Sequence, residues 1–339
     1  MNQARKLALV ALAAAPFALA AHAQAPLTYS SWVPPTHHLT IWQANWAADV
    51  EKATGGRVKF QSLPKAPAAA PGTFDAVKDG LVDLSYVTAS YTPARHILPL
   101  MAELPGAGET AEINSVAFSR IHWKQFQKYG EYKGVKLLAV WTHGPGQMFT
   151  KKQINSLSDF QNLKIRTGGG ISEKVITALG GSPFFKPAPE SYELLKSGVA
   201  DGVFFPLESI ASFKLDTVIG QATLFPGGLY SSSFGFFMNE DKWAKLSKED
   251  QAIITRHAGE AAARSNGQSW DRADKVGREA LQKAGGAIVT ASPAMAAEAR
   301  KRSAPIIDEW LKQASAKGIN AKAVLDEFHA ELKKVAAGK

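Results

Sequence analysis

The sequence contains no cysteine, which excludes disulfide bonds, thiolate metal sites and cysteine nucleophiles. It also lacks a block of five or six like charges, the pattern that would indicate a nucleic-acid-binding tail. Basic and acidic residues alternate along amphipathic segments, so the formal charge of +9 indicates a basic, solvated surface with at most a mild attraction for anionic ligands. We expect no nucleic-acid partner.

Enzyme motifs are missing as well. The chain has no G-x-S-x-G, no H-E-x-x-H and no P-loop lysine after its glycine run. His37 and His38 are adjacent, which points side chains in different directions on most backbones, so we expect an entrance-loop hydrogen bond there and no metal site. Acidic pairs such as Asp49 and Glu51 fall on a polar helix face. We therefore expect a protein that is not an enzyme and needs neither a cofactor nor a metal.

Only the N-terminus carries a long apolar run. Arg5 and Lys6, the run from Leu7 to Ala20, and the small residues around His22 indicate a secretory signal peptide that is cleaved after Ala23. The run is too short and too alanine-rich for a membrane anchor, the alternative reading. Cleavage leaves 339 − 23 = 316 residues, enough for two domains, and lowers the formal charge to +7. An exported chain held together by packing alone suggests the bacterial periplasm.

Short β-like runs alternate with helical patterns in two successive units. The expected strands are LTYSSWV (27–33), RVKFQSL (57–63), LVDLSYVT (81–88), VKLLAVWT (135–142), NLKIRT (162–167), DGVFFP (201–206) and LYSSSFGFFMN (229–239). The expected helices between them cover 36–54, 73–79, 171–179 and 190–196. This rhythm predicts an α/β fold with mostly parallel sheets, whose ligands bind beyond the carboxyl ends of the strands.

The segment from Ser247 to Ala284 contains no proline. As one helix of 38 residues it would be about 57 Å long, which is enough to straddle two domains. Two helices broken near Gly267 are the alternative. The C-terminal part, 293–337, is again helical and amphipathic.

The stretch NLKIRTGGGISEK sets Arg166 at the end of a predicted strand, before three glycines and a helix start. A guanidinium group there could bind a carboxylate through two parallel hydrogen bonds. Gly168 and Gly169 would add backbone N–H groups at the positive end of a helix. The alternative is an ion pair with a surface acid such as Asp159. Aromatic residues crowd the other predicted loop ends, and a ring-lined cleft with one arginine suits a carboxylated small molecule.

Several segments are similar to the DctP-type solute-binding proteins of TRAP (tripartite ATP-independent periplasmic) transporters. INSLSDFQNLKIRTGGG (154–170) resembles the family signature I-x-S-x-x-D-(L/F)-x-G-L-K-(I/L)-R. The family's order continues in ALGGSPFFKPAPESYELLKSGVADGVFFP (178–206) and MNEDKWAKLSKEDQAII (238–254), and upstream in DVEKATGGRVKF (49–60) and DGLVDLSYV (79–87). The resemblance covers nearly the whole chain after the predicted signal peptide.

This resemblance implies the two-domain periplasmic binding protein fold, with a hinge, a long helix spanning both domains, and closure of the cleft on an organic acid. By position, 1–23 is the signal peptide and 24–146 plus 232–270 form domain I. Domain II then comprises 147–231 plus 271–339, including the C-terminal helices. The implied partner is a TRAP membrane permease; we expect a monomer, with a dimer as the alternative.

The resemblance also implies that Arg166 pairs with the ligand carboxylate. Further contacts would come from the loop after the first strand, the loop after LVDLSYV, and the DG-x-x-x-P strand. With the ring and glycine positions, the predicted ligand-binding residues are Arg166, Gln147, Phe205, Trp32, His37, Thr88, Ser90, Tyr91, Trp141, Gly168, Gly169, Phe204 and Tyr230.

Two positions depart from the family pattern. Gln147 stands about where many members carry a second arginine, and Phe205 replaces a residue that is often polar. Both changes make the pocket less charged, so we expect a monocarboxylate with an apolar or aromatic part. An ABC-type binding protein, a sensor-linked receptor and an exported hydrolase are the competing interpretations.

Overall fold

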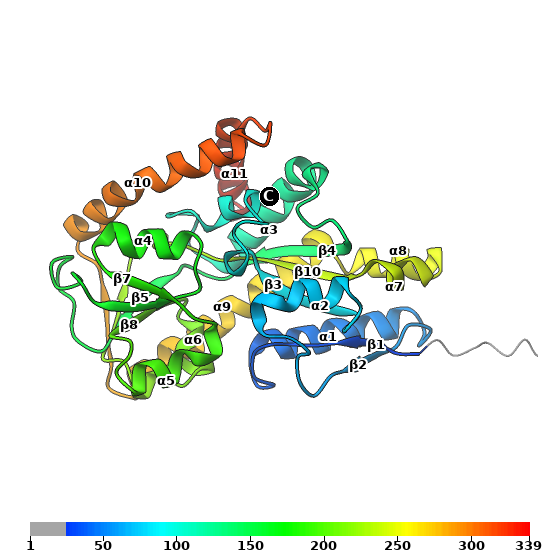
Figure 1. The fold of residues 1–339 in the computed structure, drawn as a ribbon, viewed down its shortest axis with the longest axis horizontal. Coiled ribbons are helices and arrows are strands. Elements are labelled where there is room, and N and C mark those ends of the chain that lie inside the picture. The colour runs from blue at the N-terminus through cyan, green and yellow to red at the C-terminus, as the bar shows by residue number, and fades with distance from the viewer. Residues whose placement is uncertain (1–24) are drawn as a thin grey trace, which may run out of the picture.

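The computed structural model describes residues 25–339, so the predicted signal peptide lies outside the described residues. Two β-sheets lie side by side, each with its own helices (Figure 1). The five-stranded sheet has the order β2-β1-β3-β10-β4, and the six-stranded sheet has the order β11-β9-β5-β8-β6-β7. We call the parts built on them the first lobe and the second lobe. The expected α/β fold is confirmed.

The first lobe is a mixed sheet. Its elements are β1 (Leu27–Tyr29), α1 (His38–Ala53), β2 (Phe60–Ser62), α2 (Thr73–Lys78), β3 (Leu84–Thr88), α3 (Ala111–Ile121), β4 (Val135–Thr142) and β10 (Ser233–Asn239). Strands β1, β2 and β3 are parallel, whereas β10 runs antiparallel to β3 and β4. All five residues of β3 are buried, because helices cover both faces of the sheet's centre. Helix α1 packs through Leu39, Trp42, Trp46 and Val50, which share one face at helical spacing.

The second lobe repeats the plan with more strands. Its elements are β5 (Gln147–Thr150), β6 (Lys164–Thr167), α4 (Ile171–Leu179), β7 (Ser182–Phe185), α5 (Ser191–Lys196), β8 (Gly202–Phe205), α6 (Glu208–Ser212), β9 (Gln221–Leu224) and β11 (Ala287–Thr290). Strands β6, β7 and β8 are parallel, and β5 is antiparallel to β8 and β9. Helix α4 has the bounds that the sequence predicts. Glycines with positive φ flank it, Gly170 at 62° and Gly180 at 97°, a backbone conformation that other residues rarely adopt.

The segment after β10 forms three helices, α7 (Glu240–Lys245), α8 (Lys248–Arg256) and α9 (Gly259–Lys283). The expected single helix of 38 residues is therefore wrong, and so is a break near Gly267. The chain breaks at His257 and Ala258, where Ala258 is extended with φ −103° and ψ −164°. The His257 carbonyl accepts a hydrogen bond from Trp46 Nε1 at 2.7 Å, which satisfies a carbonyl at the end of α8.

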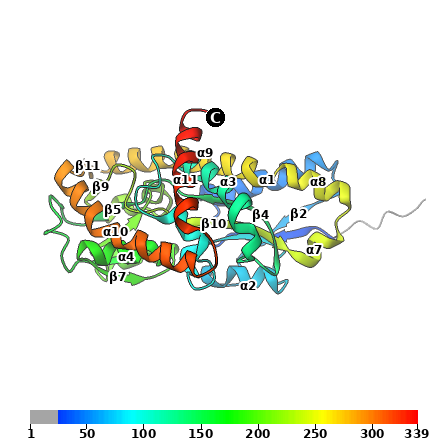
Figure 2. The ribbon, with the colours of Figure 1, turned by 90° about the horizontal axis from the view of Figure 1, so that it is seen from above.

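Helix α9 nevertheless spans both lobes, as expected. It packs against α1, α3 and β4 of the first lobe and against α6 and β11 of the second (Figures 1 and 2). Other connections between the lobes are the links from β4 to β5 and from β9 to β10. A helix that crosses the lobes beside such links is the arrangement of a hinged two-domain binding protein.

Two glycines of α9 let the lobes approach the helix closely. A Cβ atom at Gly267 would lie 2.5 Å from Glu112 Cα, at the start of α3. A Cβ atom at Gly277 would overlap the carbonyl oxygen of Leu207, just before α6. Between the glycines, Asp271 accepts hydrogen bonds from the first N–H groups of α3, at Ala111 (2.7 Å) and Glu112 (3.1 Å).

Asp274, one turn further along, accepts the N–H of Glu208 at 2.7 Å, at the start of α6. One helix thus supplies both a glycine contact and an aspartate cap to each lobe.

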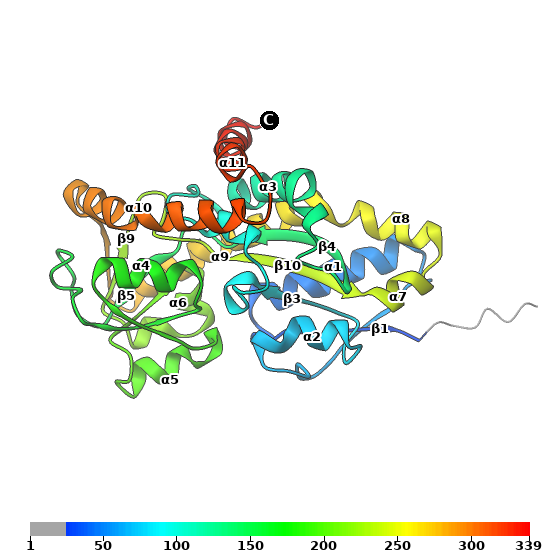
Figure 3. The same cartoon turned by 45° about the horizontal axis from the view of Figure 1, so that its top comes forward.

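The chain ends in α10 (Pro293–Ser315) and α11 (Ala321–Ala336). Helix α10 packs on α4 of the second lobe, and α11 packs on α3 of the first (Figure 3). The C-terminal pair therefore connects the two lobes. None of the helices within 25–339 is both long and apolar enough to cross a membrane.

Candidate functional site

A cavity of about 50 Å³ lies between the two lobes. The first lobe contributes the loops after β1 and β3, and the second contributes β6, β8 and the start of α6. Nine of the predicted residues line it: Trp32, His37, Thr88, Ser90, Tyr91, Arg166, Gly168, Phe205 and Tyr230. These residues come together because the carboxyl ends of β1, β3, β6 and β8 all face the cleft.

Arg166 is the cation of this cavity. Its side chain is among the largest fully buried ones, with 1% exposure. Nε donates to the carbonyl of Lys186 at 2.8 Å, and the guanidinium carbon lies 4.3 Å from the centre of the Phe205 ring. The Tyr91 hydroxyl meets the same guanidinium and also accepts the N–H of Ala188 at 3.0 Å. Burial lowers the pKa of Arg166, and Tyr91 and Tyr230 act in the opposite direction.

No carboxylate within the described residues forms an ion pair with Arg166. The alternative partner, Asp159, is committed elsewhere: one of its oxygens accepts the N–H groups of Asn155 and Ser156, each at 2.9 Å. These two backbone hydrogen bonds lower the pKa of Asp159. A surface ion pair does not explain Arg166.

Four predicted residues do not line the cavity, although each lies near a cavity residue in the sequence or on the same sheet. They are Gln147, Trp141, Gly169 and Phe204. The Gln147 side chain pairs with the backbone of Phe225, accepting its N–H at 2.7 Å and donating to its carbonyl at 3.3 Å. Trp141 is wholly buried in the first lobe, against Trp42 and Phe236.

Phe204 and Gly169 are excluded by local geometry. Phe204 neighbours Phe205 on β8, so the two side chains point to opposite faces of the sheet, and Phe204 packs on Phe160. The N–H of Gly169 donates to Thr167 Oγ1 at 3.1 Å, so this group is occupied.

The start of α4 is covered by an acid of the chain itself. Glu103 is fully buried, accepts Ser90 Oγ at 2.7 Å and Ser233 N at 2.9 Å, and lies at the N–H of Ile171. Burial raises the pKa of Glu103 to about 7, although these hydrogen bonds act to lower it. The expectation that the glycine run offers a free helix terminus to an anion is therefore wrong, because Glu103 takes that place.

Several cavity residues were not among the predicted site residues. They are Val33, Leu39, His143, Ala188, Pro206, Glu208, Ser209, Phe213, Ser232, Phe234 and Trp270. Phe234 lies in the predicted strand 229–239, but Trp270 lies on α9, where the helical pattern suggests only packing. Glu208 stands two residues after the proline that ends the DG-x-x-x-P segment, and this closeness is the one sequence signal that could have found it.

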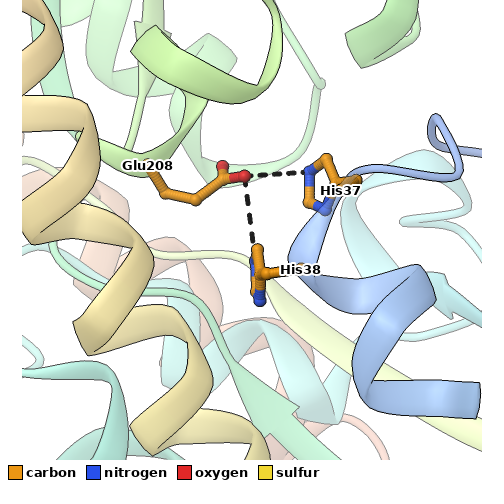
Figure 4. A group of neighbouring side chains, drawn as sticks. All are labelled: His37, His38 and Glu208. Atoms are coloured by element: carbon orange, nitrogen blue, oxygen red, sulfur yellow. Dashed lines mark ion pairs between the residues drawn. The ribbon is translucent and has the colours of Figure 1, made fainter.

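Glu208 joins the two lobes through His37 and His38 (Figure 4). Its Oε1 lies 3.1 Å from His37 Nε2 and 3.8 Å from His38 Nε2. The two imidazole rings stack with centres 4.8 Å apart, so the expectation that they point in different directions is wrong. Burial lowers the pKa of His37 against the opposing effect of Glu208, and burial also lowers the pKa of His38 well below its usual value.

The three side chains offer ligand atoms within 4.8 Å of one another, a spacing that a metal ion could use. However, His37 Nδ1 accepts the N–H of Leu39 at 3.2 Å at the start of α1, which places the imidazole proton on Nε2. A metal on Nε2 would require that proton on Nδ1, facing the Leu39 N–H. The arrangement thus fits a hydrogen bond from His37 to Glu208 better than a metal centre.

Two buried polar atoms of the cavity residues have no hydrogen-bond partner within the part of the chain that the structure describes. They are Thr88 Oγ1 in the first lobe and Trp270 Nε1 on α9. A buried polar atom without a partner is costly, so both atoms favour a ligand that carries polar groups.

Comparison with known proteins gives a consistent picture. The family model "Bacterial extracellular solute-binding protein, family 7" (DctP) matches residues 29–313. A relative from Comamonas testosteroni, named Outer membrane transporter protein TsaT, is 31% identical over 334 residues, which is 98% of each chain.

Two solved structures share the whole architecture. A TRAP periplasmic solute-binding protein from Bordetella bronchiseptica, with bound (R)- and (S)-mandelate, is 46% identical with a TM-score of 0.89; the match covers 91% of this chain and 99% of that one. A marine metagenome TRAP solute-binding protein specific for aromatic acid ligands, in complex with 3-hydroxybenzoate, is 30% identical with a TM-score of 0.84, covering 91% and 98%.

Proposed function

Since this chain belongs to the bacterial extracellular solute-binding protein family 7, the DctP family of TRAP periplasmic solute-binding proteins, we propose that it captures an aromatic monocarboxylate between its lobes. It then delivers this ligand to a TRAP-type membrane permease. Arg166 holds the carboxylate, and no covalent chemistry is involved.

The observation that carries the proposal is a buried arginine without an acidic partner. Burying a cation is costly unless a counter-charge or strong acceptors meet it. Arg166 meets the Lys186 carbonyl and the Tyr91 hydroxyl, whereas Glu190, which also favours its charge, forms its ion pair with Lys186. A ligand carboxylate supplies the missing charge, and the planar guanidinium can bind it through two parallel hydrogen bonds. One cation calls for one carboxylate, because Gln147 brings no second charge to the cavity.

The rest of the cavity suits a ring. Phe205 covers one face of Arg166 and stacks on Phe213 with centres 5.7 Å apart, while Trp32 and Phe234 approach from the first lobe. Aromatic groups pack well against such walls, in offset or edge-on geometry. The mandelates and the 3-hydroxybenzoate bound by two similar proteins are ligands of this class.

Binding closes the cleft by a shift of population. A cavity of about 50 Å³ is smaller than an aromatic acid, so the ligand enters an open form and the lobes then close around it. The ligand favours the closed form only as far as it binds that form better than the open one. Arg166 in the second lobe and Trp32, Thr88 and Tyr91 in the first give the ligand contacts on both sides.

Export and assembly complete the proposal. The signal peptide is removed after Ala23, the mature protein works as a periplasmic monomer, and the closed form docks on the permease. Gel filtration with light scattering measures the molar mass in solution and so tests whether the protein is a monomer. N-terminal sequencing of the exported protein checks the cleavage site.

A thermal-shift screen tests the ligand class. Benzoate, phenylacetate and both mandelates should each raise the melting temperature, whereas succinate, citrate and neutral benzyl alcohol should not. Native mass spectrometry of the purified protein should also find a co-purified aromatic acid. Stabilisation by di- and tricarboxylates alone would show that the proposed ligand class is wrong.

A further inference from the structure

We propose that Glu208 and Trp270 form a second polar subsite in the cavity, which binds a phenolic hydroxyl group on the ligand's ring. The ligand would then be a ring-hydroxylated aromatic acid. This inference rests on the proposed function, because it assumes that Arg166 holds the carboxylate of an aromatic ligand.

The subsite lies apart from the carboxylate-binding end, along a wall of rings. Phe205 lies under Arg166 and stacks on Phe213. Phe213 in turn lies 5.4 Å from the His37 ring, measured between centres, and His37 donates to Glu208. An aromatic ligand lying along this wall therefore has its carboxylate at one polar end and its ring substituents toward the other.

Glu208 has room for one more hydrogen bond. A carboxylate offers about four lone-pair sites. Three are filled: Oε1 accepts from His37 and from Ser212 Oγ, and Oε2 accepts from Ser209 Oγ at 3.0 Å. The Glu208 side chain is fully buried and lines the cavity, so a ligand is well placed to supply the fourth donor.

Trp270 provides the complementary donor. Its Nε1–H is buried without a partner in the described range, and its ring lines the same cavity. The His38 ring lies edge-on to it at 4.2 Å, and His38 Nε2 is 3.8 Å from Glu208, so Trp270 and Glu208 are neighbours around one histidine. A hydroxyl group is both donor and acceptor, hence it can donate to Glu208 and accept from Trp270. A phenol has a pKa near 10, so it keeps its proton at neutral pH.

The test compares matched ligand pairs by calorimetric titration. The pairs are benzoate with 3- and 4-hydroxybenzoate, and phenylacetate with 3- and 4-hydroxyphenylacetate. The wild type should bind at least one hydroxylated acid about 10- to 100-fold more tightly than its parent, as expected for a hydrogen bond to a buried charged group. Glu208→Gln and Trp270→Phe should each lose most of that preference, measured as the ratio of the affinities for the hydroxylated and the parent acid in the same variant.

Glu193→Gln is the matched control, because Glu193 lies on α5 in the same lobe and its side chain is exposed. It should leave the preference unchanged. Melting curves establish whether each variant folds. If Glu208→Gln does not fold, Ser209→Ala is the milder substitution, because it removes one hydrogen bond to Glu208 and keeps the carboxylate.

The outcomes separate the two proposals. If no aromatic acid binds, the proposed function is wrong. If the parent and hydroxylated acids bind the wild type equally, only the second subsite is wrong. Zinc binding at micromolar affinity that is lost in both Glu208→Gln and His38→Gln would also overturn the subsite, since a cation would then occupy the carboxylate.

Discussion

The guanidinium carbon of Arg166 lies 4.3 Å above the centre of the Phe205 ring, and both residues come from parallel strands of the second lobe. The ring covers one face of the cation and leaves its hydrogen-bonding edge for other partners. A phenylalanine at this position thus lowers the polarity of the cavity while it keeps the arginine in place.

Replacement of Arg166 by lysine or alanine should weaken the binding of an aromatic acid by about 2 to 5 kcal/mol, because a buried charge pair loses one partner. Lysine should not rescue it, since a single ammonium cannot form two parallel bonds. Calorimetric titration measures the loss, with Arg302→Lys as the control at an exposed arginine paired with Glu298. Unchanged affinity in Arg166→Ala would contradict the assignment.

Removal of the Tyr91 hydroxyl should raise the dissociation constant about tenfold, because it loosens the guanidinium that the hydroxyl contacts. The variant is Tyr91→Phe, which keeps the ring beside Trp32. Tyr192→Phe, in α5, is the matched control. Equal affinities for the two variants would mean that Tyr91 does not position Arg166.

The stability of the protein should depend on pH through Glu103. Its pKa is raised to about 7, above the ordinary 4.5, so the folded state binds a proton that the unfolded state does not hold between these values. The cost of this carboxylate is thus greatest above pH 7 and is relieved as pH falls toward 4.5. Urea unfolding at pH 5 and pH 8 should show a smaller difference for Glu103→Gln than for the wild type.

The control for that comparison is Glu249→Gln, since the Glu249 side chain is 71% exposed. A Glu103→Gln variant with the wild-type pH dependence would show that another group is responsible.

Substitution of Gly277 by alanine should destabilise the protein by about 1 to 3 kcal/mol, because the added methyl group overlaps the Leu207 carbonyl. Gly72→Ala is the control: its Cβ would meet only Ala68 Cβ, at 3.4 Å. Chemical denaturation compares the two. A Gly277→Ala variant as stable as Gly72→Ala would mean that α6 can move off α9 at little cost.

Elements with strong local signals could be predicted from the sequence. Helix α4 is bounded by glycines, and β4 and β8 are apolar runs, so their positions follow from local chemistry. The short strands β5, β7, β9 and β11 are not predicted, since four residues that owe their conformation to neighbouring strands carry little pattern of their own. The sequence does not predict the break before α9 for a similar reason, because a tertiary contact from Trp46 accompanies it.

The cavity residues also divide into those that a local sequence signal predicts and those that depend on the tertiary structure. Arg166, Tyr91 and Phe205 lie at strand ends, where a parallel sheet directs its ligands, and the sequence places them at the cavity. The sequence alone does not decide whether Phe204 or Phe205 points into the cavity. Adjacent strand residues alternate between the two faces of a sheet, and only the structure shows which face of β8 lines the cavity. Trp270 could not be predicted, since its place in the cavity depends on how α9 crosses both lobes.

The two lobes take their relative orientation from the helical register of α9. Asp271 accepts a hydrogen bond from the first N–H of α3, and Asp274 accepts one from the first N–H of α6. The two aspartates are three residues apart, which is about 4.5 Å along the helix axis. One residue inserted between these aspartates would turn the second lobe by about 100° around α9 while leaving each sheet intact. Such a protein would keep both halves of the cavity but would no longer bring them face to face. Helix α9 therefore fixes the distance and angle between the two halves that hold the ligand, although it contributes only one tryptophan to the described cavity wall.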